Sequence, residues 1–344
     1  MKKTTWNRLA AAIMVVGMVS ALLVGCGNNK EASDQADTSE APEKNYVIKM
    51  GHVLATSHPV HIAMTEAAEK IAERTNGGVE LQIYPNGELS SYQDGVEAVR
   101  SGAPYLFFSS PGQLSDYVPD MAALQAPFLY STFEEYSNLM GTDVMNKLQA
   151  QAEEQGIKVL SLNFVSGFRH LLTDKAITCV DDVKNLKIRV PGNPVFVQPW
   201  EAMKANPSSI GWGETYQALQ QGVVDAIEGT VGNIYDAKMF ELKKEMTRTA
   251  HQIDMSGMFI SMDFWNTIPE EYQTIIQEEI DAAAERQNAA AQQIEEDYIG
   301  KLEEVGVTFH DVDKSTFIEA TKGIVQQYEL GQELVDTVAE VNGK

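Results

Sequence analysis

The chain between residues 46 and 108 alternates short apolar runs with amphipathic stretches. Residues 47–53 read as a strand, and residues 79–84 alternate apolar and polar positions, which predicts a second strand. Residues 60–75 space their apolar side chains as one face of a helix does. A second helix over residues 92–100 and a strand over residues 105–108 follow. This order predicts right-handed βαβ units and a mostly parallel sheet.

The middle of the chain also alternates predicted strands and helices, and these elements are shorter. Residues 158–164 and 187–190 read as strands, and residues 223–228 are a further strand candidate. Residues 196–205 and 214–221 carry apolar side chains at helical spacing. The remaining 300 or so residues after the N-terminal segment exceed a single average domain, so two lobes are expected.

The last third predicts one long strand and one long helix. Residues 251–262 are rich in Met, Ile and Phe and read as a long strand. A helical pattern opens at Pro269-Glu270-Glu271 and runs to about Val305, with acidic residues in its first turn as the helix dipole favours. It is either one helix that crosses both lobes or two helices broken near Gly300. A strand over residues 307–310 and a terminal helix from Ser315 complete the prediction.

The first 25 residues have the pattern of a secretory signal. Lys2, Lys3 and Arg8 precede an apolar stretch that ends at Leu23-Val24-Gly25-Cys26. A cysteine at this point is typical of a lipoprotein, in which the thiol is acylated and becomes the first residue. Residues 26–45 are almost free of apolar side chains and read as a flexible tether. The alternative is an uncleaved anchor helix with an incidental Cys26.

The charge of the chain excludes one class of partner. The sequence has 26 Lys and Arg against 49 Asp and Glu, and removing residues 1–25 takes away three cations and no anion. The remaining chain then carries 23 cations against 49 anions, a net charge of −26. Nucleic acid would be repelled, so no nucleic-acid partner is expected. Cys179 is the only cysteine besides Cys26 and is expected to be a small buried group without a disulfide.

No enzyme or metal motif stands out. The sequence lacks Gly-x-Ser-x-Gly, the phosphate-binding loop and His-Glu-x-x-His. His52, His58 and His61 cluster and could serve a zinc site, but a polar loop between strand and helix explains them as well. We therefore expect no cofactor and no metal. The main enzymatic alternative is an envelope enzyme acting on a sugar acid with Asp225 and Glu228 as acid and base. Because residues three apart on a strand point to opposite faces, the pair is poorly placed for that role.

Two arginines are candidates for binding an anion. Arg169 comes just after the predicted strand over residues 158–164, and Arg189 lies in the strand Lys187-Ile188-Arg189-Val190, which Pro191 closes. Ile188 and Val190 would share one face, leaving Arg189 on the other. A guanidinium suits bidentate binding of a carboxylate. An ordinary surface arginine remains the alternative from the residues alone.

From Tyr46 to His310 the chain resembles the solute-binding proteins of tripartite ATP-independent periplasmic (TRAP) transporters. The order and spacing of four segments carry the resemblance: Leu81-Gln82-Ile83-Tyr84-Pro85, Ala126-Pro127-Phe128-Leu129, residues 183–191 and residues 214–228. The resemblance implies a periplasmic-binding-protein-like fold of two α/β lobes with hinge-crossing strands and a long helix spanning both. We expect lobe I at residues 46–165 plus about 256–294, and lobe II at residues 166–255 plus about 295–344.

The resemblance also implies the binding residues. The carboxylate-binding arginine of the family falls on Arg189 and a supporting arginine on Arg169. The remaining candidates are a pocket aromatic, small polar groups and further polar side chains: Trp212, Ser109, Ser110, Glu228, Asn193 and His52. Core packing is the alternative for Trp212. Gly229-Thr230 replaces the Asn-Pro that is common in the family, so an amide for a ligand hydroxyl is missing there.

The function that this resemblance implies is transport. A lipid-anchored monomer of the cell envelope would bind a small carboxylate-bearing ligand, with a hexuronate or another sugar acid favoured, and deliver it to TRAP permease subunits. C4-dicarboxylates, keto acids and aromatic acids follow as ligand classes. A ligand sensor for a signalling partner would use the same fold.

Overall fold

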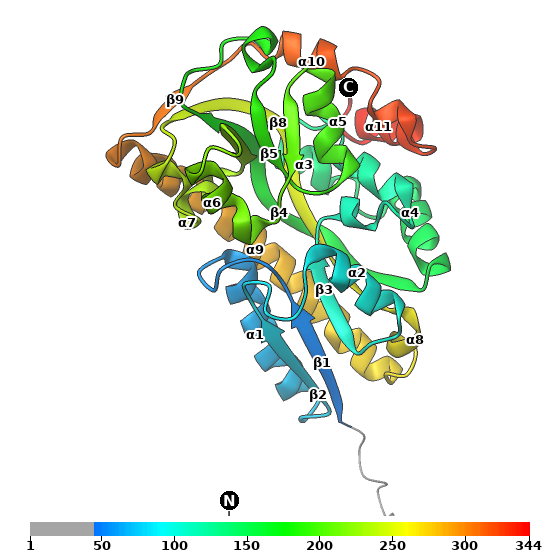
Figure 1. Cartoon of the computed structure of the whole chain (residues 1–344). Helices are drawn as coiled ribbons and strands as arrows, with labels where there is room; N and C mark the ends of the chain where they lie inside the picture. Colours follow the sequence, from blue (N-terminus) through cyan, green and yellow to red (C-terminus); the bar gives the residue numbers. More distant parts are fainter. Residues whose placement is uncertain (1–44) are drawn as a thin grey trace, which may run out of the picture. The chain divides into compact units, whose positions relative to one another are not determined.

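The computed structural model describes residues 45–344, and Figure 1 shows its arrangement. The predicted signal peptide, Cys26 and all but the last residue of the tether therefore lie outside the described residues. No helix within residues 45–344 has the length and apolar character needed to cross a membrane.

One mixed sheet organises the described chain, in the order β2-β1-β3-β8-β4-β7-β5-β6, with β9 paired to β8. Its strands are β1 Tyr46–Gly51, β2 Val79–Tyr84, β3 Tyr105–Ser109, β4 Ile157–Thr173, β5 Lys187–Val190, β6 Asn206–Ser209, β7 Ala226–Gly229, β8 Glu245–Ser261 and β9 Thr308–His310. The βαβ units pair in parallel as predicted, but β8 runs antiparallel to β3 and β4, and β4 runs antiparallel to β7. The expectation of a mostly parallel sheet therefore missed the antiparallel centre.

Helices cover both faces of this sheet. They are α1 Pro59–Arg74, α2 Tyr92–Arg100, α3 Phe133–Ser137, α4 Asp143–Glu154, α5 Pro194–Ala202, α6 Thr215–Gln220, α7 Val231–Asp236, α8 Met262–Trp265, α9 Glu270–Glu304, α10 Ser315–Thr321 and α11 Gly331–Val341. Short 3₁₀ turns lie between them, including η1 Pro111–Leu114, η2 Pro119–Gln125 and η4 Trp212–Glu214. The terminal helix predicted from Ser315 is interrupted, and α10 and α11 are separate elements.

The antiparallel centre consists of two strands of 17 residues each, β4 and β8, which lie side by side in the sheet (Figure 1). One end of β8 pairs with β3, while the other end pairs with β9, and the far end of β4 pairs with β7. The two strands thus connect the first group of strands (β1–β3) to the second group (β5–β7). Their pairing shifts register at four places, as β-bulges do, which bends a strand and increases its twist.

Each half of the sheet buries apolar side chains on both faces. In β3, Tyr105 and Phe107 face one buried cluster, and Leu106 and Phe108 face another. In the second half Ile188 and Val190 of β5 share a cluster with Trp200, as the alternation of that strand predicted. A strand buried on both faces has the continuous apolar character seen here.

Helix α9 is a single helix of 35 residues, so the alternative of a break near Gly300 is wrong. At about 1.5 Å per residue it is about 50 Å long. Ile276 and Ile280 pack in the cluster of β1–β3 and α1, whereas Leu302 packs in the cluster of β7 and α7. The helix therefore contacts both halves of the sheet.

The boundaries of the two predicted lobes remain a prediction. One element has contacts that cross them. Helix α11, which we assigned to lobe II, packs Leu334 and Val338 into the cluster that contains α4 and the start of β4.

Candidate functional site

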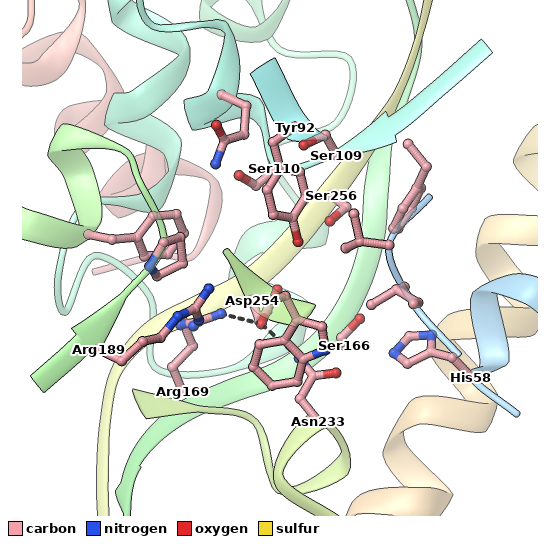
Figure 2. A pocket seen from close by; sticks show the side chains of 17 residues that line it. His58, Tyr92, Ser109, Ser110, Ser166, Arg169, Arg189, Asn233, Asp254 and Ser256 are labelled. Atoms are coloured by element: carbon pink, nitrogen blue, oxygen red, sulfur yellow. Dashed lines mark hydrogen bonds and ion pairs between the residues drawn. The ribbon is translucent and has the colours of Figure 1, made fainter. Parts of the chain in front are cut away.

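A cavity lies where the crossing strands β4 and β8 pass between the two groups of strands (Figure 2). It encloses about 680 Å³ of empty space, part of it open to solvent. Residues from the first half of the sheet line one wall and residues from the second half line the other. The lining side chains are Val53, Leu54, His58, Tyr92, Phe108, Ser109, Ser110, Gln113, Ser166, Arg169, Arg189, Pro191, Phe196, Trp212, Asn233, Asp254 and Ser256.

Arg189 projects into this cavity from β5 and is only 2% exposed. Its Nε and Nη2 donate to the carbonyl oxygen of Ile210 at 2.9 and 2.7 Å, which fixes the plane of the guanidinium. Within residues 45–344 no carboxylate forms an ion pair with it. Burial lowers the pKa of Arg189 to about 10 from its ordinary 12.5. Arg189 is thus a buried cation that is held in place by a neutral group and has N–H donors left over.

Arg169 also lies in the cavity wall, but its charge is compensated. The sequence placed it just after a strand, whereas it lies inside β4, which continues to Thr173. Gly167 is opposite Asp254 on β8 and Leu171 is opposite Glu228 on β7, so Arg169 lies between the two carboxylates. Gly167, at one of the bulges, has φ 130°, a conformation that glycine adopts readily.

The two carboxylates occupy most donors of Arg169. Its Nε and Nη2 form a bidentate pair with Glu228, the Nη2 contact being 2.6 Å, and Nη1 donates to Asp254 Oδ2 at 2.5 Å. Burial acts to lower the pKa of Arg169, but the charges of Glu228 and Asp254 raise it above its ordinary value. Burial acts to raise the pKa of Glu228, yet Arg169 lowers it to about 2. Burial keeps the pKa of Asp254 above its ordinary value.

Aromatic side chains flank the two arginines. The Trp212 ring centroid lies 5.3 Å from Arg189 Cζ, and the Phe196 ring lies 5.0 Å from Arg169 Cζ. Trp212 also packs against the cluster of β7 and α7, so core packing and cavity lining both apply to it. Tyr92, on α2, reaches the cavity with its hydroxyl, and burial raises the pKa of this phenol to about 12.

Small polar groups complete the lining. Ser109 and Ser110, both predicted, follow one another where β3 ends, and the buried Ser109 Oγ has no hydrogen-bond partner within residues 45–344. Ser166 and Ser256 come from the crossing strands. Asn233, in the first turn of α7, brings an amide to the wall near Gly229-Thr230, where the sequence lacked one.

Three predicted binding residues do not line the cavity. Glu228 is fully buried outside the cavity lining, and its carboxylate accepts hydrogen bonds from Arg169. Asn193 accepts from Val195 N at the start of α5 and lines a neighbouring open recess, which shares Tyr92 and Gln113 with the cavity. His52 Nε2 is 3.1 Å from His61 Nδ1, and His58 takes the place in the cavity wall that we expected for His52.

Sequence reasoning missed Asp254, Tyr92, His58 and Asn233 as lining residues. The sequence did offer an indication for Asp254, because it is the only charged residue within the mostly apolar segment of residues 252–262. For Tyr92 the only signal was its place at the start of a helix. Its approach to the arginines depends on the fold.

The sequence left a metal site and acid–base catalysis as alternatives. Residues 45–344 contain no group of three or more His, Cys, Asp or Glu side chains placed to hold a metal ion. Asp225 and Glu228 both lie outside the cavity lining, and Glu228 is engaged by Arg169.

Comparison with known proteins assigns the chain to a family. The model of the bacterial extracellular solute-binding proteins, family 7 (DctP), matches residues 50–330. The chain belongs to this family.

Solved structures of TRAP periplasmic solute-binding proteins share the fold. A TRAP periplasmic solute-binding protein from Fusobacterium nucleatum with bound sn-glycerol-3-phosphate is 35% identical, with a TM-score of 0.84 over 86% of this chain and 98% of that one. Another from Chromohalobacter salexigens, with bound D-glucuronate, is 28% identical, with a TM-score of 0.81 over 86% of this chain and 99% of that one. Among curated sequences, the C4-dicarboxylate-binding periplasmic protein DctP of Vibrio cholerae is 27% identical over 87% of this chain and 91% of its own length.

The present family-7 protein is therefore a TRAP-type solute-binding protein with a mixed α/β fold of two lobes. Its cavity combines one uncompensated guanidinium, one compensated guanidinium and a wall of hydroxyl and amide groups. This arrangement can bind a small anion that carries hydroxyl groups.

Proposed function

We propose that this protein is a lipid-anchored receptor of the cell envelope, which captures a small polyhydroxylated organic anion between its lobes and delivers it to a TRAP membrane permease. The observation that carries the proposal is Arg189, a cation that is 2% exposed and has no carboxylate partner within residues 45–344. A buried charge is unfavourable unless it is paired, so an anionic ligand would supply the missing partner.

Two chemical classes of ligand share this description. Sugar acids, among which a hexuronate was favoured from the sequence, agree with the bound D-glucuronate of the Chromohalobacter protein. Phosphate esters of glycerol agree with the bound ligand of the Fusobacterium protein, the more similar of the two. In sugar acids and glycerol phosphates alike, one acid group would form an ion pair with Arg189. The hydroxyl groups would form hydrogen bonds with Ser109, Ser110 and Asn233.

The anchor and the partners are part of the same proposal. Cys26 would carry the lipid and residues 26–45 would tether the lobes to the membrane, with permease subunits receiving the ligand. We further propose that the protein acts as a monomer and that it performs no chemical reaction on the ligand. The engagement of Glu228 by Arg169 supports the last point, because it removes the acid–base candidate from use.

A thermal-shift screen tests the proposal. A ligand present at a thousandfold excess over its Kd stabilises the fold by about 4 kcal/mol, which raises the melting temperature by several degrees. We expect this shift with hexuronates, aldonates or glycerol phosphates. Nucleotides or metal salts giving such a shift, with every organic anion giving none, would contradict the proposal.

A further inference from the structure

Asp254 places a carboxylate in the wall of the cavity that we propose binds an anion. It lies on β8 opposite Gly167, and its side chain is 14% exposed (Figure 2). Its Oδ2 accepts from Arg169 Nη1 at 2.5 Å and from Asn233 Nδ2 at 3.4 Å. Its Oδ1 has no hydrogen-bond or ion-pair partner within residues 45–344. One carboxylate oxygen is thus left to accept a hydrogen bond from a ligand.

The charges around the cavity are balanced before a ligand arrives. Arg169 and Arg189 supply two cations, and Glu228 and Asp254, which are both ion-paired with Arg169, supply two anions. A ligand acid group that binds Arg189 pairs the one uncompensated cation. The four side chains and the ligand together then carry a net negative charge. A second acid group would enter a site that has no cation left to receive it.

The rest of the lining offers nothing that would compensate a second acid group. Besides Arg169 and Arg189, the lining residues include no Lys and no further Arg. His58 is the only histidine among them, and burial lowers its pKa to about 4, so it is neutral at pH 7. The other polar members are hydroxyl and amide groups, among them Ser166, Ser256 and Tyr92. These groups bond well to ligand hydroxyls, and they leave the charge of a second carboxylate facing Asp254.

We propose that Asp254 determines the specificity of the site by accepting a hydrogen bond from a ligand hydroxyl and repelling a second acid group. The inference rests on the proposed binding of an organic anion at Arg189, and it narrows the ligand to polyhydroxylated acids with the acid group at one end. C4-dicarboxylates and aldarates, which carry an acid group at each end, are rejected. This specificity sets the chain apart from the Vibrio cholerae relative, whose name states that it binds C4-dicarboxylates.

The experiment compares ligands that differ only at the far end. D-gluconate and D-glucarate share a carbon chain, but the terminal hydroxymethyl group of the first is a carboxylate in the second. The pair sn-glycerol 3-phosphate and 3-phospho-L-glycerate differs in the same way, with the same configuration at C2. Calorimetry on the purified full chain should show the single-ended member of a pair binding at least about thirtyfold more tightly, because like charges brought together oppose binding strongly. Succinate should bind no better than D-glucarate.

Two variants locate the effect. Asp254→Asn keeps the shape of the side chain and removes its charge, so the preference within a pair should fall by at least about tenfold. Asp116→Asn is the matched control, because Asp116 is an exposed carboxylate at the rim of the neighbouring recess, outside the cavity. It changes the net charge equally and should leave the preference unchanged. Unliganded melting curves show whether each variant folds.

The outcomes separate the two proposals. A wild-type protein that binds both members of a pair within about threefold of each other overturns the role of Asp254, whether or not the variant folds. An Asp254→Asn protein that folds and keeps the full preference overturns it as well. If none of the anions binds to the wild-type protein, the proposed function itself is wrong.

Discussion

Replacing Arg189 with methionine should remove ligand binding without weakening the unliganded fold. Methionine keeps the aliphatic part of the side chain and removes the guanidinium. If Arg189 holds the acid group of the ligand in a closed cavity, its loss should weaken binding by about 2–5 kcal/mol, which is about thirtyfold to several thousandfold. Arg189→Lys keeps the charge but cannot form two parallel hydrogen bonds, so it should also weaken binding.

The stability of the unliganded protein should change little, whereas truncating most buried side chains destabilises a fold. The pKa of Arg189 falls from 12.5 to about 10 on burial. A shift of this size corresponds to a penalty of about 3 kcal/mol for keeping the charged form buried. The donor is charged, so the two hydrogen bonds to the carbonyl oxygen of Ile210 contribute about 1.5 kcal/mol each. The loss of these bonds offsets the relieved burial penalty, so the free energy of unfolding of unliganded Arg189→Met should stay within about 1 kcal/mol of the wild-type value.

The assay combines calorimetry with melting curves of the unliganded protein. The control is Arg248→Met, which removes a cation that is 37% exposed and paired with Asp311 on the surface. This variant should bind ligand like the wild type. The reasoning is refuted if Arg189→Met binds within about threefold of the wild type, or if it melts many degrees lower without ligand.

Three further predictions concern other parts of the chain. Glu228→Gln removes the fully buried partner of Arg169 and should destabilise the fold by about 3–5 kcal/mol in urea unfolding at pH 7. The difference from wild type should shrink as pH falls from 4.5 through about 2, because the unfolded state binds the proton first and Glu228 is protonated in both states only below the folded pKa of about 2. His58 has a folded pKa of about 4 against 6.5 when unfolded, so the unfolded state binds the proton first and stability should fall as pH drops from 6.5 to 4. His58→Asn can still accept from Val60 N at the start of α1, and it should reduce this pH dependence, to which His52 also contributes because burial lowers its pKa to about 4; an unchanged slope would contradict the assignment. Cys26→Ser should release the protein from the membrane fraction or leave the precursor unprocessed, and unchanged processing and membrane association would show that the anchor prediction is wrong.

Much of the fold could be predicted because its elements have strong local signals. The helix over residues 92–100 and the strands over residues 79–84 and 187–190 have the predicted bounds, since each has clear periodicity and turn residues at its ends. The long helix α9 was also visible, because its apolar positions repeat at helical spacing and its first turn is acidic.

The crossing strands could be predicted only in part. The strand predicted to end at residue 164 continues to Thr173 through Ser166, Gly167 and Arg169. A glycine and a charged residue normally argue against a strand interior. Here the pairing with β8 and the bulge at Gly167 keep the strand going, and both are long-range features that no local pattern reveals. The same pairing produces the antiparallel centre of the sheet.

The candidate site also combines residues that local sequence patterns revealed with contacts that depend on long-range pairing. Arg189 stood out because it lies in an apolar strand that ends at a proline, and the structure places it in the cavity. The sequence could not show which groups compensate each arginine, because Glu228 and Asp254 are 59 and 85 residues away from Arg169 in the chain. Only the register of β4 with β7 and β8 brings the three together.

This register explains how a strongly acidic chain can attract an anion. The net charge of the sequence is −23, so an acid in solution is repelled at long range. Glu228 and Asp254 are committed to Arg169, and this leaves Arg189 with its full charge in a site where solvent screens little. A second arginine that competed for the ligand would accept acids of many shapes. With Arg169 compensated, one acid group is bound at one place, and the hydroxyl and amide groups around it select among the ligands that carry that group.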